Sequence, residues 1–236
     1  MSSTSPPSHQ SSSPSHKPRI CFFGGEKGGI GKTTLATLFA YLFLEAGREL
    51  AGATLDYSNP AFKKQLAGIL PDDCVGAFSL VRSRDVSELG NFLSRNRSRV
   101  VLLDSPSSFY YLFQNYLADF LLVSDRLDFI WIVSEEANSF KQFFAYQQIL
   151  EGHPNLNYLI FFPDWIHGGE FSSDFQGLPC YRLPTLSPFV LSRLRENLQF
   201  LKFKESDDPY LKGVIESYLI RFKNQFGKEL SLFLTG

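Results

Sequence analysis

The chain has 236 residues, a length that fits one α/β domain with a sizeable core. Its residues are 44% hydrophobic and 20% charged, as in ordinary globular proteins, and a formal net charge of −1 excludes a generally basic nucleic-acid-binding protein. The sequence contains neither the roughly 18 uninterrupted apolar residues of a membrane helix nor a signal-peptide pattern, so we expect a cytoplasmic protein.

Composition divides the chain into two parts. Residues 1–18 consist almost entirely of Ser, Pro, His, Thr and Gln, which predicts a disordered tail because so little apolar surface is available to bury. We expect one domain over residues 19–236. Nearly continuous apolar runs predict buried strands over residues 20–23, 50–55, 99–103, 129–133 and 158–162. Helical spacing of apolar residues predicts helices over residues 33–46, 140–150, 187–201 and 209–226. Strands that alternate with helices predict an α/β fold, a doubly wound and mostly parallel sheet flanked by helices.

A glycine-rich segment joins the first predicted strand to the first predicted helix. It reads Lys27-Gly28-Gly29-Ile30-Gly31-Lys32-Thr33-Thr34. Glycines let the backbone turn tightly and direct its N–H groups at phosphate oxygens, and the start of a helix favours an anion. We therefore expect this whole segment, from Gly28 to Thr34, to bind a nucleotide. Lys32 would reach the β- and γ-phosphates, and the Thr33 hydroxyl would ligate Mg²⁺.

The first lysine of the segment distinguishes it from the general phosphate-binding loop. Glu26 stands where the general pattern has glycine, and the sequence matches the variant K-G-G-x-G-K-T instead. This variant resembles the ParA/MinD family of dimeric ATPases. The resemblance implies that Lys27 has a catalytic role, because the corresponding lysine reaches across an ATP-bridged homodimer to the partner's phosphates.

Two further segments extend the resemblance to the metal site. Residues 100–103 lead into Asp104-Ser105-Pro106, which looks like the family's Walker B strand. The resemblance implies that Asp104 and Asp56 help to hold Mg²⁺ with Thr33. A helix-capping role is the alternative for Asp104. Ser58 stands at the position of the family's catalytic carboxylate, and a serine cannot act as a base near neutral pH. We therefore expect slow hydrolysis, or a carboxylate supplied by Glu26 or by a partner.

The base-binding residues match the family less well. Residues 161–164 read Phe-Phe-Pro-Asp where the family has an adenine-contacting asparagine. The loop around Pro184 resembles the family's loop beside the base. Because no guanine-specific N-K-x-D motif is present, adenine is favoured, and the expected cofactors are ATP and Mg²⁺.

Two surfaces are candidates for binding a partner. Basic residues in the C-terminal part suggest non-specific DNA binding, with a solvated helix face as the alternative: Arg193, Arg195, Lys202, Lys204, Arg221 and Lys223. The apolar stripe of the predicted helix 209–226 suggests a membrane anchor as in MinD, but its continuity with the fold favours packing on the sheet.

The resemblance implies an ATP-dependent dimerising switch similar to ParA partition ATPases, which act in plasmid or DNA segregation or in cargo positioning. Such a protein would be cytoplasmic or nucleoid-associated and would bind a small adaptor protein. One alternative is a weakly hydrolysing nucleotide-binding regulator of a conjugation or secretion apparatus. Another is a MinD-like membrane-cycling ATPase. Relatives that need paired cysteines are excluded because no C-x-x-C is present.

Overall fold

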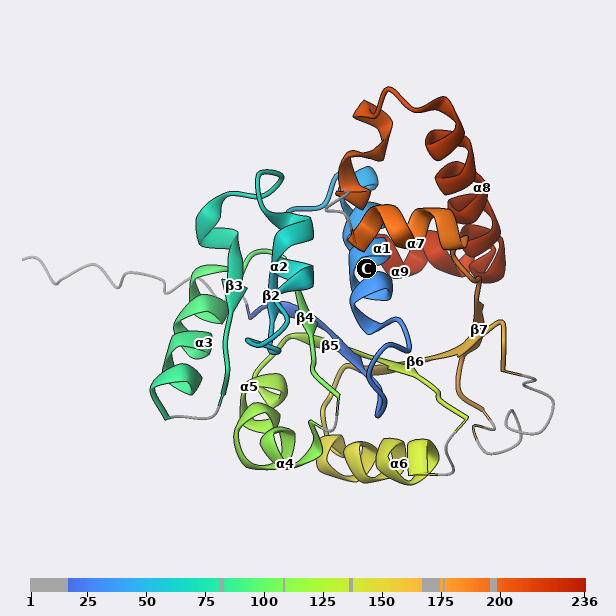
Figure 1. The fold of residues 1–236 in the computed structure, drawn as a ribbon. Helices are drawn as coiled ribbons and strands as arrows, with labels where there is room; N and C mark the ends of the chain where they lie inside the picture. The colour runs from blue at the N-terminus through green and yellow to red at the C-terminus, as the bar shows by residue number, and fades with distance from the viewer. Residues whose placement is uncertain are drawn as a thin grey trace, which may run out of the picture.

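The computed structural model describes residues 17–80, 83–107, 109–135, 138–166, 175, 177–195 and 199–236. In these residues, parallel strands form a sheet in the order β3-β2-β4-β1-β5-β6-β7 (Figure 1). The strands are β1 (Arg19–Gly24), β2 (Leu50–Thr54), β3 (Val75–Ala77), β4 (Val100–Asp104), β5 (Arg126–Ile132), β6 (Leu156–Pro163) and β7 (Cys180–Leu183). The predicted parallel α/β sheet is therefore confirmed. The tail expected over residues 1–18 lies almost wholly outside the described residues.

Helices cover both faces of the sheet (Figure 1). One face carries α1 (Lys32–Glu45), α2 (Ala61–Leu66), α7 (Pro188–Arg195), the 3-10 helix η3 (Phe200–Glu205), α8 (Pro209–Phe226) and α9 (Glu229–Thr235). The other carries α3 (Ser83–Arg95), α4 (Tyr110–Leu112), the π-helical turn η2 (Phe113–Leu117), α5 (Ala118–Leu122) and α6 (Asn138–Leu150). A short 3-10 helix, η1 (Asp72–Cys74), precedes β3.

The alternation of side chains along each strand produces two separate cores. In β1, Cys21 and Phe23 join the core beneath α1 and α8, whereas Ile20 and Phe22 join the core beneath α4 to α6. The ring of Phe22 stacks on that of Phe129 from the neighbouring strand, with centroids 5.4 Å apart. Because both faces are buried, the central strands contain nearly unbroken apolar runs, and these runs made them predictable.

The C-terminal helix packs on the sheet, as favoured from its sequence. Its apolar stripe, from Leu211 to Phe226, is buried in the core beneath α1. Asp208 caps the helix start, since its Oδ1 accepts the Leu211 N–H at 3.0 Å, and Pro209 occupies the first turn. No described helix is long and apolar enough to cross a membrane.

The helix predicted over residues 187–201 is wrong at its C-terminal end. Gln199 is extended, with φ −81° and ψ 104°, so it cannot continue α7 and instead precedes η3. Its amide donates hydrogen bonds to the carbonyls of Lys64 and Ala67, at 3.2 and 2.8 Å. The contact with α2 stabilises this break in the helix, and the local apolar spacing gives no sign of such a contact.

The strand order places a crevice beside β1. After β1 the chain crosses on one side towards β2, whereas β4 leads through α4 and α5 to β5 on the other side. In open α/β sheets, ligands bind outside the carboxyl ends of the strands where the order reverses in this way. The glycine-rich segment follows β1 directly and therefore lies at this position.

Candidate functional site

The glycine-rich loop occupies the turn between β1 and α1. Gly29 and Gly31 have φ values of 78° and 106°, a region that side chains with a Cβ rarely adopt, so these two positions require glycine. Gly31 is also the N-cap of α1, and none of the described side chains caps this helix end. The amides of the first turn of α1 are therefore available to an anion.

The other residues of the loop divide between surface and core. Lys27, Gly28 and Gly29 are exposed, whereas the side chain of Ile30 is buried in the core. A Cβ at Gly25 would lie 2.5 Å from Ile30 Cδ1, so Ile30 packs closely over the start of the loop. Ile30 could therefore contact a ligand only through its backbone.

Lys32 lies inside the loop. Its side chain is 7% exposed, and Nζ donates a hydrogen bond to the Lys27 carbonyl at 2.9 Å. Burial lowers the pKa of Lys32, and the nearby carboxylates of Asp104 and Asp56 oppose this effect. The Lys32 ammonium group is therefore held in place by one backbone acceptor and two acidic neighbours. In this position it can bind an anionic ligand.

Asp104 lies at the carboxyl end of β4, beside Phe23 of β1 and Thr54 of β2 in the sheet register. Its Oδ2 accepts a hydrogen bond from Thr33 Oγ1 at 2.8 Å. Its Oδ1 is buried, and among the described residues no donor reaches it. Burial raises the pKa of Asp104 to about 7, against the opposing effects of the Thr33 hydroxyl and Lys32. A buried carboxylate oxygen with no donor, next to a threonine hydroxyl, offers oxygen ligands of the kind that a hard cation such as Mg²⁺ binds.

Asp56 and Ser58 form a closed turn after β2. Asp56 Oδ1 accepts hydrogen bonds from Ser58 Oγ at 2.5 Å and from the Asn59 N–H at 3.1 Å. Ser58 is exposed, and its hydroxyl points back at Asp56. Asp56 is close enough to Lys32 and Asp104 to raise the pKa of both. The structure therefore gathers Thr33, Asp104 and Asp56 at one edge, with Ser58 hydrogen-bonded to Asp56 at its rim.

Two contacts around the loop were not predicted. Glu26 Oε1 accepts a hydrogen bond from Gln142 Nε2 of α6 at 3.3 Å, so the carboxylate considered for catalysis faces α6. Gly28 lies beside the loop after β4, where its Cβ would be 3.8 Å from Ser107 Oγ. Both contacts link residues far apart in the chain, and no local pattern in the sequence indicates them.

The segment around Pro184 borders the same loop. Pro184 is buried and directly follows β7, whose Leu183 would contact a Cβ at Gly31 at 3.6 Å. Asp164 Oδ2 accepts the Thr185 N–H at 3.2 Å. Asp164, the last residue of the run 161–164, therefore holds the loop that contains Pro184.

The basic residues proposed for DNA binding do not form one uniform patch. Lys223 Nζ lies 2.5 Å and Lys204 Nζ 3.9 Å from the Glu45 carboxylate, which partly neutralises both. Arg221 is exposed on α8, Arg193 is exposed on α7, and the Arg195 side chain lies outside the described residues.

The fold adds two lysines that were not predicted for this surface. Lys63 and Lys64 of α2 are both exposed, and α2 contacts the start of η3 through Gln199. A Cβ at Gly68, just after α2, would lie 3.7 Å from Lys202 Nζ. Lys202 thus lies close to the C-terminal end of α2.

Comparisons with known proteins identify the fold. No protein-family model matches the sequence, and no curated protein matches it. Among solved structures, the MinD cell division protein of Aquifex aeolicus superposes with a TM-score of 0.55 and 14% identity, over 87% of this chain and 97% of that chain. MinD of Pyrococcus horikoshii, solved with Mg-ADP, gives a TM-score of 0.56 and 13% identity, over 90% and 98%. A ParA family ATPase from Chlorobium tepidum gives 0.52 and 14%, over 87% and 99%. The resemblance to the ParA/MinD family is therefore confirmed as a shared fold.

Proposed function

We propose that the chain is a nucleotide-dependent molecular switch that binds ATP and Mg²⁺ at the glycine-rich loop and dimerises in response. The observation that carries this proposal is the pairing of Thr33 with Asp104, whose second carboxylate oxygen is buried and has no donor among the described residues. The large majority of buried side-chain polar atoms have a hydrogen-bond partner, so this oxygen is an exception that calls for an explanation. It is positioned to hold a cation next to a phosphate-binding helix start.

The residues of the site divide into distinct roles in this proposal. Thr33, Asp104 and Asp56 would hold Mg²⁺, and Lys32 with the loop amides would hold the phosphates. Bound Mg-ATP supplies the γ-phosphate that distinguishes the two states of the switch. Lys27 is exposed on the loop and would contribute across a homodimer.

Calorimetry with Mg-ATP tests the nucleotide site. We expect Lys32→Ala to abolish binding while the protein stays folded in a thermal melt, because within the described part of the chain Lys32 Nζ makes one hydrogen bond, to a backbone carbonyl. The matched control is Lys228→Ala, which removes an exposed lysine that follows α8 and should bind as the wild type does. Retained ATP affinity in the Lys32 variant would refute the assignment.

For the biological role we propose cargo or DNA positioning of the ParA type. The exposed α2 lysines together with Lys202 support a DNA surface, and the helix that could have anchored the protein to a membrane is packed on the sheet. DNA pelleting and liposome pelleting, each with and without ATP, distinguish the two surfaces. ATP-dependent pelleting that is lost on Lys63→Glu and Lys64→Glu would support DNA, whereas pelleting with liposomes alone would refute it.

A second candidate is a nucleotide-binding regulator, for instance of a conjugation or secretion apparatus, that hydrolyses ATP very slowly. The observation favouring it is Ser58, whose hydroxyl donates to Asp56 Oδ1 and which, as a serine, cannot act as a base near neutral pH. Turnover measured with DNA and a partner protein separates the two, since a switch that resets by hydrolysis must be accelerated by them.

A further inference from the structure

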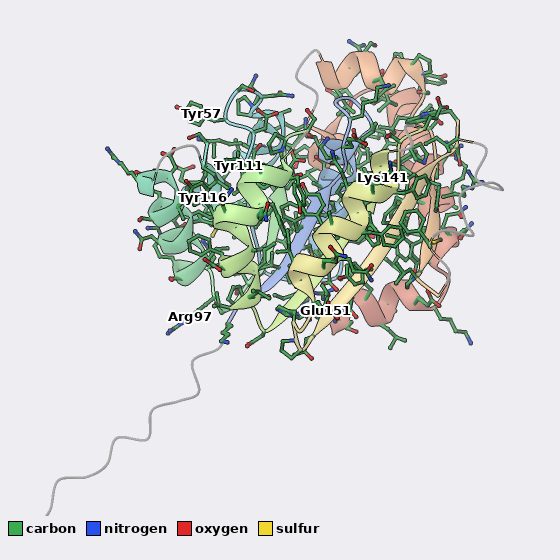
Figure 2. The ribbon with its side chains drawn as sticks, turned by 90° about the horizontal axis from the view of Figure 1, so that it is seen from below. Tyr57, Arg97, Tyr111, Tyr116, Lys141 and Glu151 are labelled. Atoms are coloured by element: carbon green, nitrogen blue, oxygen red, sulfur yellow. The ribbon has the colours of Figure 1, made fainter. Side chains whose placement is uncertain are left out.

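A groove lies at the amino end of the sheet, on the side opposite the glycine-rich loop. It has a volume of about 590 Å³, within the range of ligand-binding pockets. Residues before β1, the C-terminal half of α3 and the region around α5 form its walls. Figure 2 shows Arg97 at this end of the molecule and Tyr57, beside Ser58, at the other. The groove is therefore separate from the candidate nucleotide site.

The close approach of two helices shapes this groove. A Cβ at Gly90 of α3 would lie 2.9 Å from the Phe120 ring of α5. The absence of a side chain at Gly90 therefore lets the ring rest against the α3 backbone, where it remains partly exposed. Val123, in the same wall, is 52% exposed. These side chains give the groove an apolar wall.

The charges in the walls are all positive. Lys17 and Arg97 line the groove and are both exposed, and no carboxylate is part of its lining. Within the described residues, neither side chain forms an ion pair. Asp125 Oδ2 accepts the Lys17 backbone N–H at 2.9 Å, and Asp125 is not part of the lining. The uncharged polar side chains of Asn91 and Ser94 complete the rim.

We propose that this groove is a docking site for an acidic segment of a partner protein. Apolar side chains of that segment would rest on Phe120 and Val123, and its carboxylates would pair with Lys17 and Arg97. Charge complementarity and the apolar wall together select this occupant. A nucleic acid needs a row of cations that follows successive phosphates, and the groove has two cations beside an apolar surface.

The location of the groove has a consequence for the order of binding. A segment docked at the amino end of the sheet leaves the carboxyl end, with Asp104 and Lys32, uncovered. The partner would therefore bind with and without nucleotide, and the proposal does not depend on the proposed function. Failure of nucleotide binding would leave it intact.

Fluorescence anisotropy with a defined peptide tests the proposal. The probe is a short fluorescein-labelled peptide in which aspartates flank a Leu-Phe pair, and its counterpart has lysines in place of the aspartates. We expect the acidic peptide to bind the full chain and the lysine peptide not to bind. Arg97→Glu and, independently, Lys17→Glu should each weaken binding by roughly tenfold or more, because an attraction becomes a repulsion.

The matched control is Arg84→Glu on the same helix. The Arg84 side chain is 85% exposed, pairs with Glu88 and is not part of the groove, so this variant should bind as the wild type does. Equal losses in the Arg84 and Arg97 variants, or no binding of the acidic peptide to the wild type, would overturn the proposal. Displacement of the peptide by a single-stranded oligonucleotide that itself depends on Arg97 would assign the groove to nucleic acid and overturn it as well.

Discussion

Replacement of Asp104 by asparagine should stabilise the nucleotide-free protein and abolish its response to Mg-ATP. The carboxylate is 2% exposed, and its Oδ1 has no hydrogen-bond donor among the described residues. Asparagine has nearly the same shape and can still accept the Thr33 hydroxyl. The substitution therefore removes a buried negative charge while it keeps the local packing.

The size of the effect follows from the pKa of Asp104. Burial raises it from 3.8 to about 7, so the folded state binds the proton more tightly than the unfolded chain. The free energy of unfolding therefore falls as the pH rises through this window, and the cost at pH 7 is on the order of 4 kcal/mol. The amide nitrogen that replaces Oδ1 lacks an acceptor, which costs about 1–2 kcal/mol. A net gain of roughly 2 kcal/mol remains, or about 4–8 °C in Tm.

Thermal melts in EDTA, and separately in buffer with Mg-ATP and no EDTA, measure this effect. The gain should approach its maximum near pH 7 and should turn into a small loss towards pH 4, where the wild-type carboxyl is largely protonated when folded and the cost of the unpaired amide remains. Only the wild type should be stabilised further by Mg-ATP, by about 2.7 kcal/mol at a ligand concentration of 100 Kd.

The control is the same substitution at Asp128, a fully buried carboxylate in β5. Arg19 Nε at 2.8 Å, Arg126 Nε at 3.0 Å and Asn157 Nδ2 at 3.1 Å all donate to it. Asp128→Asn should destabilise the protein by about 3–5 kcal/mol, because it leaves buried donors and a buried charge unpaired. A lower Tm for Asp104→Asn in EDTA at pH 7 would refute the reasoning that Asp104 is held at a cost for function.

Three further predictions concern the switch and the stability of the chain. Lys27→Ala should keep ATP affinity but lose ATP-dependent dimerisation in light scattering, and a variant that still dimerises would contradict the role across the interface. Ser58→Asp should accelerate hydrolysis with ATP affinity nearly unchanged, and equal turnover with DNA and partner present would count against it. His153 accepts the Asn155 N–H at Nδ1 and contacts Ser124 Oγ through Nε2, and burial lowers its pKa. The stabilisation by His153 is complete above about pH 6.5 and is lost as the pH falls. In thermal melts, His153→Gln should therefore reduce the dependence of Tm on pH below about 6.5.

The sequence predicts the centre of the fold better than its edges. The strands β1, β2, β4, β5 and β6 are apolar on both faces, and each appears as an apolar run. The edge strands β3 and β7 were not predicted, because they have three and four residues and are only partly buried. The helix α3 was also missed, although Val86, Leu89 and Leu93 follow the spacing of an amphipathic helix and the signal was present in the sequence.

The candidate site shows the same division between local and long-range information. The loop around Lys32 is a local pattern and was identified with its position in the fold. The Thr33–Asp104 hydrogen bond joins residues 71 positions apart, and it follows only once β1 and β4 are neighbours. The link between α2 and η3 through Gln199 spans 135 positions and has no local signal. Gln199, which makes this contact, is extended where the apolar spacing had predicted a continuous helix.

Ser58 connects the geometry of the site to the expected rate of hydrolysis. Its hydroxyl donates to Asp56 Oδ1, and the Asn59 N–H donates to the same oxygen, so both bonds hold the turn closed. A second aspartate at position 58 would face the first at hydrogen-bond distance, and like charges so close oppose each other unless a cation or a lysine lies between them. In the nucleotide-free protein, Ser58→Asp should therefore open the turn. The introduced carboxylate should assist hydrolysis only when Mg²⁺ is bound nearby. If the variant hydrolyses ATP faster, the introduced carboxylate acts only in the nucleotide-bound protein. ATP affinity and turnover must therefore be measured on the same preparation.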